Sequence, residues 1–127
     1  HFATSLIFDG YSQLNGTGNS DKMYGTAADD VFWSKDGADE IWGGNGADTF
    51  LYTQTYQTDP GSHDTILDFN SSEDRIDISA ITNGAGISRT LSNGTLFKID
   101  SDNNGSYEMQ WELDDYTGTA DDVTVIT

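Results

Sequence analysis

Apolar residues in the first half of the chain recur every nine positions. From Gly16 on, four consecutive nine-residue segments each carry a large apolar residue at the eighth position: Met23, Phe32, Ile41 and Phe50. The residues before it are small or turn-forming, so each segment has room for only a very short strand with its middle side chain inward. Two such units complete one coil of a flattened solenoid. The pattern therefore predicts that Met23 stacks on Ile41 and Phe32 on Phe50.

The sixth position of each segment is an aspartate: Asp21, Asp30, Asp39 and Asp48. Residues 7–15 keep an apolar residue at position eight but have Ser12 at position six, and we interpret them as a degenerate first turn. Equivalent turns recur in every second unit, so their backbone carbonyls and aspartates should face each other. Hard oxygen ligands from two stacked turns suit Ca²⁺.

Composition agrees with a bound cation. The chain of 127 residues has 22 acidic and 5 basic residues, a formal net charge of −17. Such repulsion opposes a compact state unless something neutralises it, and it excludes nucleic acid as a partner. Cysteine is absent, so no disulfide stabilises the domain. No apolar run is long enough to span a bilayer, so we expect no membrane insertion. No signal peptide is visible, and a start at His1 suggests a segment of a longer chain.

The pattern resembles the RTX nonapeptide repeat, G-G-x-G-x-D-x-U-x, a calcium-binding signature. Residues 43–51 match every position, whereas the two preceding units have other residues at some glycine positions. The resemblance implies that one turn gives carbonyls one and three with its aspartate, and that the turn two units further on gives carbonyls two and four with its own. The implied first site is Gly16, Gly18 and Asp21 with Lys35, Gly37 and Asp39, and the second is Gly25, Ala27 and Asp30 with Gly44, Gly46 and Asp48.

The resemblance also implies half-sites at the end of the repeats, from Ser34 and Asp36 in one turn and from Gly43 and Asn45 in the next. After residue 51 the period fails, and residues 63–69 and 74–79 look like the segment that closes RTX rolls and completes the last calcium site. Gly61 lies two unit lengths after Gly43, so we expect Asp64 to complete the Gly43 half-site. For the three later aspartates, Asp68, Asp74 and Asp77, we favour roles in turns and at strand ends.

Residues 95–99 and 107–113 alternate in polarity and predict antiparallel strands. Between them, residues 100–105 read Asp-Ser-Asp-Asn-Asn-Gly, which matches the opening of an EF-hand-type loop. Position twelve of that loop would be Trp111, where a glutamate is needed. An Asn-Gly hairpin explains the segment equally well, so both interpretations stay open.

Position nine of the units points outward and holds Tyr24, Trp33, Trp42 and Leu51. Outward aromatics can stack on sugars, or they can lie beneath the cap, which is the arrangement we favour. The last residues, 121–127, are acidic and then apolar, and they resemble the C-terminal signal read by type I ABC exporters; an ordinary edge strand is the alternative.

The sequence thus predicts an all-β protein: a calcium-bound parallel β-roll over residues 1–57, then an antiparallel β cap over residues 58–127 that ends in the secretion signal. We expect a monomeric, extracellular or cell-surface module of a larger adhesin or secreted enzyme, exported by a Gram-negative type I system. It would bind several Ca²⁺ ions and fold on meeting them. We find no catalytic apparatus and predict no enzyme. The alternative is a carbohydrate-binding accessory module of a polysaccharide-active protein.

Overall fold

The computed structural model describes residues 4–7 and 13–127, and its regular elements are almost all β-strands. Two single-turn helices are present as well. The elements in chain order are β1 (Thr4–Ile7), β2 (Gln13–Asn15), β3 (Asp21–Tyr24), β4 (Val31–Trp33), β5 (Glu40–Trp42), β6 (Thr49–Leu51), η1 (Thr55–Thr58), β7 (Asp64–Ile66), β8 (Arg75–Asp77), α1 (Ser79–Thr82), β9 (Ser88–Ser92), β10 (Leu96–Asp100), β11 (Met109–Leu113) and β12 (Thr124–Ile126).

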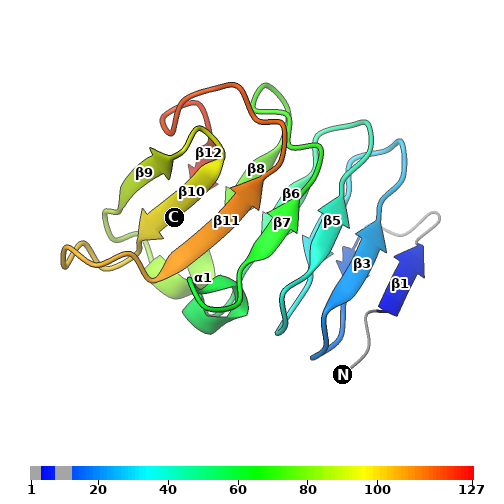
Figure 1. Ribbon diagram of the computed structural model, residues 1–127, viewed down its shortest axis with the longest axis horizontal. Coiled ribbons are helices and arrows are strands. Elements are labelled where there is room, and N and C mark those ends of the chain that lie inside the picture. Colours follow the sequence, from blue (N-terminus) through cyan, green and yellow to red (C-terminus); the bar gives the residue numbers. More distant parts are fainter. Residues whose placement is uncertain (1–3, 8–12) are drawn as a thin grey trace.

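The strands form two sheets, and the chain alternates between them from β1 to β8. One sheet has the order β1-β3-β5-β7-β11-β10-β9 and the other β12-β8-β6-β4-β2 (Figure 1). Met23 is in register with Ile41, and Phe32 with Phe50. The predicted parallel solenoid with two units per coil is therefore confirmed. Leu14 of β2 is in register with Phe32 of β4. Ser12 of the expected degenerate turn lies outside the described residues.

Parallel pairing continues past residue 57, where the sequence placed the end of the roll. Strand β7 pairs parallel with β5, and β8 with β6. Further on, β11 pairs parallel with β7 and β12 with β8. Among the described strands, β9, β10 and β11 alone pair antiparallel. The cap thus extends the solenoid along its axis, because both β7 and β8 repeat the Asp-x-apolar pattern after turns of altered length.

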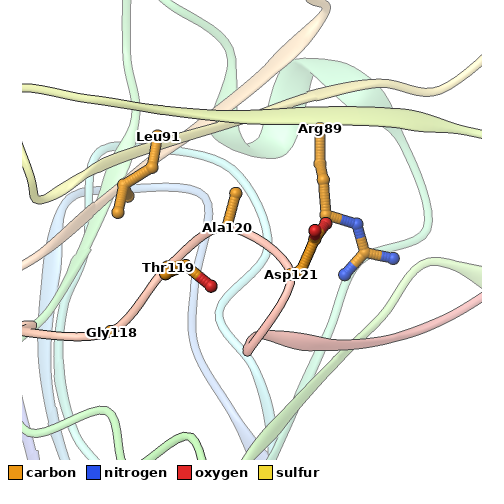
Figure 2. Close-up of a pocket in the computed structure, with 6 residues that line it drawn as sticks. All are labelled: Arg89, Leu91, Gly118, Thr119, Ala120 and Asp121. Carbon is orange, nitrogen blue, oxygen red and sulfur yellow. The ribbon is translucent and has the colours of Figure 1, made fainter.

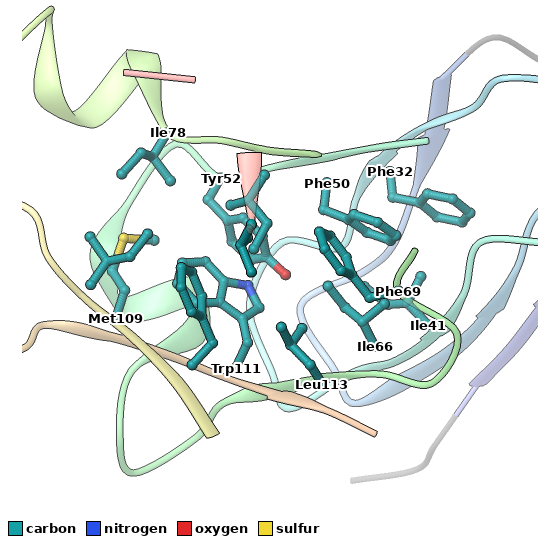
Figure 3. Packing of buried hydrophobic residues seen from close by; sticks show 14 of the residues in the cluster. Phe32, Ile41, Phe50, Tyr52, Ile66, Phe69, Ile78, Met109, Trp111 and Leu113 are labelled. Atoms are coloured by element: carbon teal, nitrogen blue, oxygen red, sulfur yellow. The ribbon is translucent and has the colours of Figure 1, made fainter. Parts of the chain in front are cut away.

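Buried side chains fill the space between the sheets along the whole solenoid. The rings of Phe32 and Phe50 are stacked with centroids 5.3 Å apart, and Phe69 continues the row at 6.0 Å from Phe50 (Figure 3). In the cap, the ring of Trp111 is fully buried and meets Tyr52 edge-on. Each such side chain stabilises the fold by roughly 1.5–3 kcal/mol relative to an exposed one. The core is one residue wide, so the turns outside it also decide stability.

The cap strands continue the two sheets, so the outward aromatics of β3, β4 and β5 lie beside the cap and not beneath it (Figure 1). All four of these position-nine side chains are half-buried. Tyr24 and Trp42 stack with centroids 4.6 Å apart and 9° between their planes. That separation is close to the spacing of neighbouring strands, so the rings stand upright on the sheet. Solvent therefore meets their edges. No helix within residues 4–7 and 13–127 has the length and apolar character to cross a bilayer.

Candidate metal centre

The repeat aspartates form two ladders along the solenoid. The Oδ1 atom of Asp39 accepts a hydrogen bond from the backbone N–H of Asp21 at 2.8 Å, one coil earlier. On the other side, Asp48 Oδ1 accepts from the N–H of Asp30 at 2.9 Å. These bonds draw the turns together, so carboxylates from successive coils lie in one row on each side of the solenoid.

Both ladders continue into the cap. Asp64 Oδ1 accepts from the N–H of Asp39, and Asp74 Oδ1 from the N–H of Asp48, each at 2.9 Å. Two rows of three aspartates result: Asp21, Asp39 and Asp64 in one, and Asp30, Asp48 and Asp74 in the other. All six are buried.

Two of these buried carboxylates are incompletely satisfied. Among the described residues, Asp39 Oδ2 and Asp48 Oδ2 are buried without a hydrogen-bond partner, and the side chains are 1% and 0% exposed. Burial raises the pKa of Asp39 to about 9, and the nearby charge of Asp64 adds to the effect. Burial likewise raises the pKa of Asp48 to about 8, against the lowering effect of the Asp30 N–H. A buried anion without a partner is costly, so each site calls for a proton or a cation.

Glycine is needed where the turns approach each other. A Cβ on Gly25 would lie 2.4 Å from the carbonyl oxygen of Gly43, one coil later. A Cβ on Gly44 would lie 2.5 Å from the carbonyl oxygen of Thr26, and Gly44 has φ +83°. Backbone carbonyls of one coil therefore lie directly against the next coil, which is the arrangement that an oxygen cage between turns requires.

The structure brings together the two predicted ligand sets. Turn 16–21, with Gly16, Gly18 and Asp21, stacks on turn 34–39, with Lys35, Gly37 and Asp39. Turn 25–30, with Gly25, Ala27 and Asp30, stacks on turn 43–48, with Gly44, Gly46 and Asp48. The ladder bonds and the glycine contacts join each pair. Their ligand roles stay predictions.

The predicted position of Asp64 is wrong. Asp64 begins β7, beside β5, and follows Asp39 by 25 residues, so it faces the Ser34 turn and not the Gly43 turn. A count in whole nine-residue units misplaces Asp64, because η1 and its flanking loop lengthen the connection between β6 and β7. Asp64 Oδ2 accepts hydrogen bonds from the hydroxyls of Tyr52 at 2.7 Å and Ser34 at 2.8 Å. Burial raises the pKa of Asp64 to about 7, although these hydroxyls and the Asp39 N–H oppose the effect.

Two aspartates that we expected at turns and strand ends contact the Gly43 turn. Asp74 takes the ladder position above Asp48, and Asp68 accepts hydrogen bonds from the N–H groups of Gly43 and Gly44 at 2.7 and 2.9 Å. The recurring Asp-x-apolar pattern at residues 74–76 is the signal for Asp74. Asp77 has the expected strand-end role, since it accepts from the N–H and hydroxyl of Ser79. The remaining predicted half-site residues, Asp36 and Asn45, have exposed side chains in their turns.

The second acidic loop connects β10 and β11. Ligand atoms of Asp100, Asp102 and Glu108 lie within 4.8 Å of one another. Both oxygens of Asp100 already accept backbone hydrogen bonds, from Asn104 and Gly105. These bonds satisfy the loop without an ion, and the hairpin and metal interpretations both stay open.

A pocket of about 470 Å³ lies in the cap, away from the aspartate ladders. Figure 2 shows its lining, with Arg89 and Leu91 of β9 on one side and residues 118–121 on the other. Arg89 donates a hydrogen bond to the carbonyl of Val123, which ties β9 to the segment before β12. The pocket holds no cluster of polar groups comparable to the ladders.

Calcium fits the residues present. The unpartnered carboxylate oxygens of Asp39 and Asp48 are hard, anionic donors beside the stacked backbone carbonyls of two coils, and the chain has no cysteine. Such a donor set selects Ca²⁺ over softer metals.

Comparison with known proteins supports this class. The family model described as Peptidase M10 serralysin C terminal matches residues 9–123. The chain belongs to this family, whose members are RTX-type calcium-binding β-rolls found in secreted proteins. No curated protein matches the chain.

The solved structures similar to the chain include two subunits of one enzyme. The AlgE6R3 subunit from the Azotobacter vinelandii mannuronan C5-epimerase shares 30% identity with a TM-score of 0.65, over 87% of this chain and 71% of the other. The AlgE6R2 subunit of that epimerase shares 25% identity with a TM-score of 0.53, over 87% of this chain and 81% of the other.

Proposed function

We propose that this chain is a calcium-dependent folding module: it stays unfolded where calcium is scarce and folds when it meets extracellular calcium. The observation that carries the proposal is the pair of buried, unpartnered carboxylate oxygens on Asp39 and Asp48. A cation there removes the cost of burying both charges.

Linkage gives the size of the effect. An ion that binds the folded chain alone stabilises it by about 2.7 kcal/mol at a hundred times its dissociation constant. Extracellular calcium modules have dissociation constants of about 10⁻⁴–10⁻³ M. Calcium at extracellular levels therefore stabilises the roll, whereas in cytosol the net charge of −17 acts against folding.

The proposal extends to export. A chain that stays unfolded inside the cell can be threaded through a type I ABC exporter, which would recognise the C-terminal residues 121–127. Outside a Gram-negative cell, the module that emerges first would fold on calcium and hinder backward movement. The parent protein, an adhesin or a secreted enzyme, would follow, and the module itself would act as a monomer without catalytic activity.

Far-UV circular dichroism during a calcium titration tests the folding step, with magnesium as the control. We expect a coil-to-β transition at sub-millimolar to millimolar calcium and none with magnesium, because Mg²⁺ demands a tighter octahedral site and sheds water reluctantly. A chain that is already fully β in excess chelator would contradict the proposal.

A second candidate function is binding of a polysaccharide. The likeness to subunits of a mannuronan C5-epimerase favours it. Three features oppose it: the net charge of −17 repels an acidic polysaccharide, Trp111 is buried, and Tyr24 and Trp42 present ring edges. Glycan-array binding by the calcium-loaded chain, lost in Trp42→Ala, would support this alternative.

A further inference from the structure

The turns that carry the ladder aspartates are of two kinds. In turns 16–21 and 25–30, the second carboxylate oxygen is already bonded within its own turn. Asp21 Oδ2 accepts the Thr17 N–H at 2.7 Å, and the Thr17 hydroxyl lies 2.9 Å from Oδ1. Asp30 has the same contacts with Thr26, at 2.8 and 3.0 Å. We call these closed turns.

In turns 34–39 and 43–48, by contrast, the second oxygen has no partner. The residue four positions before the aspartate is Lys35 in one and Gly44 in the other, and neither side chain carries a hydroxyl. Asp39 Oδ2 and Asp48 Oδ2 are left buried and unpaired. We call these open turns.

Backbone conformation explains the difference. Lys35 has φ +65° and Gly44 φ +83°, and neither N–H is hydrogen-bonded to the carboxylate of its own turn; the Gly44 N–H bonds to Asp68 instead. Glycine adopts this conformation freely, and Lys35 is supported in it by its ammonium, 4.8 Å from the centroid of the Trp33 ring. Thr17 and Thr26 are not among the positive-φ residues, as expected for a β-branched side chain.

The other two ladder aspartates are also satisfied without an ion. Asp64 Oδ2 accepts the hydroxyls of Tyr52 and Ser34. Asp74 Oδ2 accepts the N–H of Asn70, four residues earlier, at 2.9 Å, as in the closed turns. Within the described residues, open carboxylates therefore occur only at the two central turns of the ladders.

We propose that Thr17 and Thr26 are built-in substitutes for calcium, and that the ladders take one ion at each open turn, two in all. This inference rests on the proposed calcium binding. It adds that ions bind at the open turns and not at the closed turns. The closed turns give the roll an end that needs no metal, on which the open turns assemble when calcium arrives. Residue identity at the second position of each unit thus sets the number of ions bound to the ladders.

The test is calcium stoichiometry in matched variants, measured by titration calorimetry and native mass spectrometry on the whole chain. The wild type should bind two ions at the ladders. Thr26→Gly removes the closing hydroxyl and permits positive φ, so it should bind three. Thr26→Val removes the hydroxyl but keeps the β-branch and the backbone N–H bond to Asp30 Oδ2, so it should stay at two. In the reverse direction, Lys35→Thr introduces a β-branch that disfavours positive φ, so that the N–H and the hydroxyl can both close the turn, and it should bind one.

The outcomes separate this inference from the proposed function. A wild type that binds no calcium overturns both. A wild type that binds calcium, with Thr26→Gly and Thr26→Val equal in stoichiometry, overturns the role of the threonines alone. Circular dichroism in saturating calcium verifies that each variant folds. Since the acidic loop at residues 100–105 could add an ion, each variant is also measured in an Asp102→Asn background, which must leave the differences between variants unchanged.

Discussion

A single buried carboxylate illustrates how this fold trades stability for metal binding. Asp48 is fully buried, with one oxygen bonded to the Asp30 N–H and the other unpartnered. The free-energy cost of leaving a buried charge unpaired exceeds the stabilisation that one hydrogen bond contributes. The residue is therefore a poor choice for a metal-free solenoid and a good one for a calcium-bound solenoid.

Replacing this carboxylate should have opposite effects in the two states. We expect Asp48→Asn to raise the free energy of unfolding in chelator, because the amide keeps an acceptor for Asp30 and removes the buried charge. Calcium affinity should fall tenfold or more, about 1.4 kcal/mol, since an anionic ligand is lost. The folded fraction of each variant in chelator, from far-UV circular dichroism, measures the first effect, and a calcium titration measures the second. Asp114→Asn is the matched control, with the same charge change at an exposed side chain outside the predicted ligand sets. Equal behaviour of the two variants would argue against a metal role for Asp48.

At the scale of elements, the nine-residue period predicted the strands β3 to β6. It could not place the strands β7 and β8, where the spacing changes. Each of β3, β4, β5 and β6 contains a predicted apolar residue, because nine positions leave room for one turn and one strand. The spacings from Asp39 to Asp64 and from Asp48 to Asp74 are 25 and 26 residues, so counting in whole units could not place β7 and β8. The stacking of the turns followed from the period, whereas the difference between open and closed turns depends on φ, which the period does not give.

The C-terminal strand has a double role that can be tested. Strand β12 pairs parallel with β8, and the Ile126 carbonyl accepts the N–H of Ile78. Removing residues 124–127 exposes this edge and should lower the midpoint of thermal unfolding in calcium by several degrees, with calcium stoichiometry unchanged because the ladders lie elsewhere. Secretion through a type I exporter should be lost. Loss of secretion without any loss of stability would show that β12 is a signal only. Loss of stability without any loss of secretion would show that β12 is an ordinary edge strand.

For the whole molecule, the raised pKa values of the buried ladder aspartates make the stability of the fold depend on pH. Burial raises the pKa of Asp39 to about 9, that of Asp48 to about 8 and that of Asp64 to about 7, whereas each aspartate in the unfolded chain titrates near 3.8. Between these values the folded, metal-free chain holds more protons than the unfolded chain. Its stability is therefore fully present below about pH 4 and is lost as pH rises towards about 9.

Calcium should reverse this slope. The ion replaces the protons on the open turns, so its affinity rises with pH over the same window as proton competition fades. We expect the folded fraction in chelator, read from far-UV circular dichroism, to fall from about pH 4.5 to about pH 8.5, and the stabilisation added by millimolar calcium to grow over that range. Asp48→Asn should flatten both trends, because it removes one of the shifted groups. A folded fraction in chelator that rises with pH would mean that the ladder carboxylates are ionised in the metal-free fold, and that calcium is not needed to neutralise them.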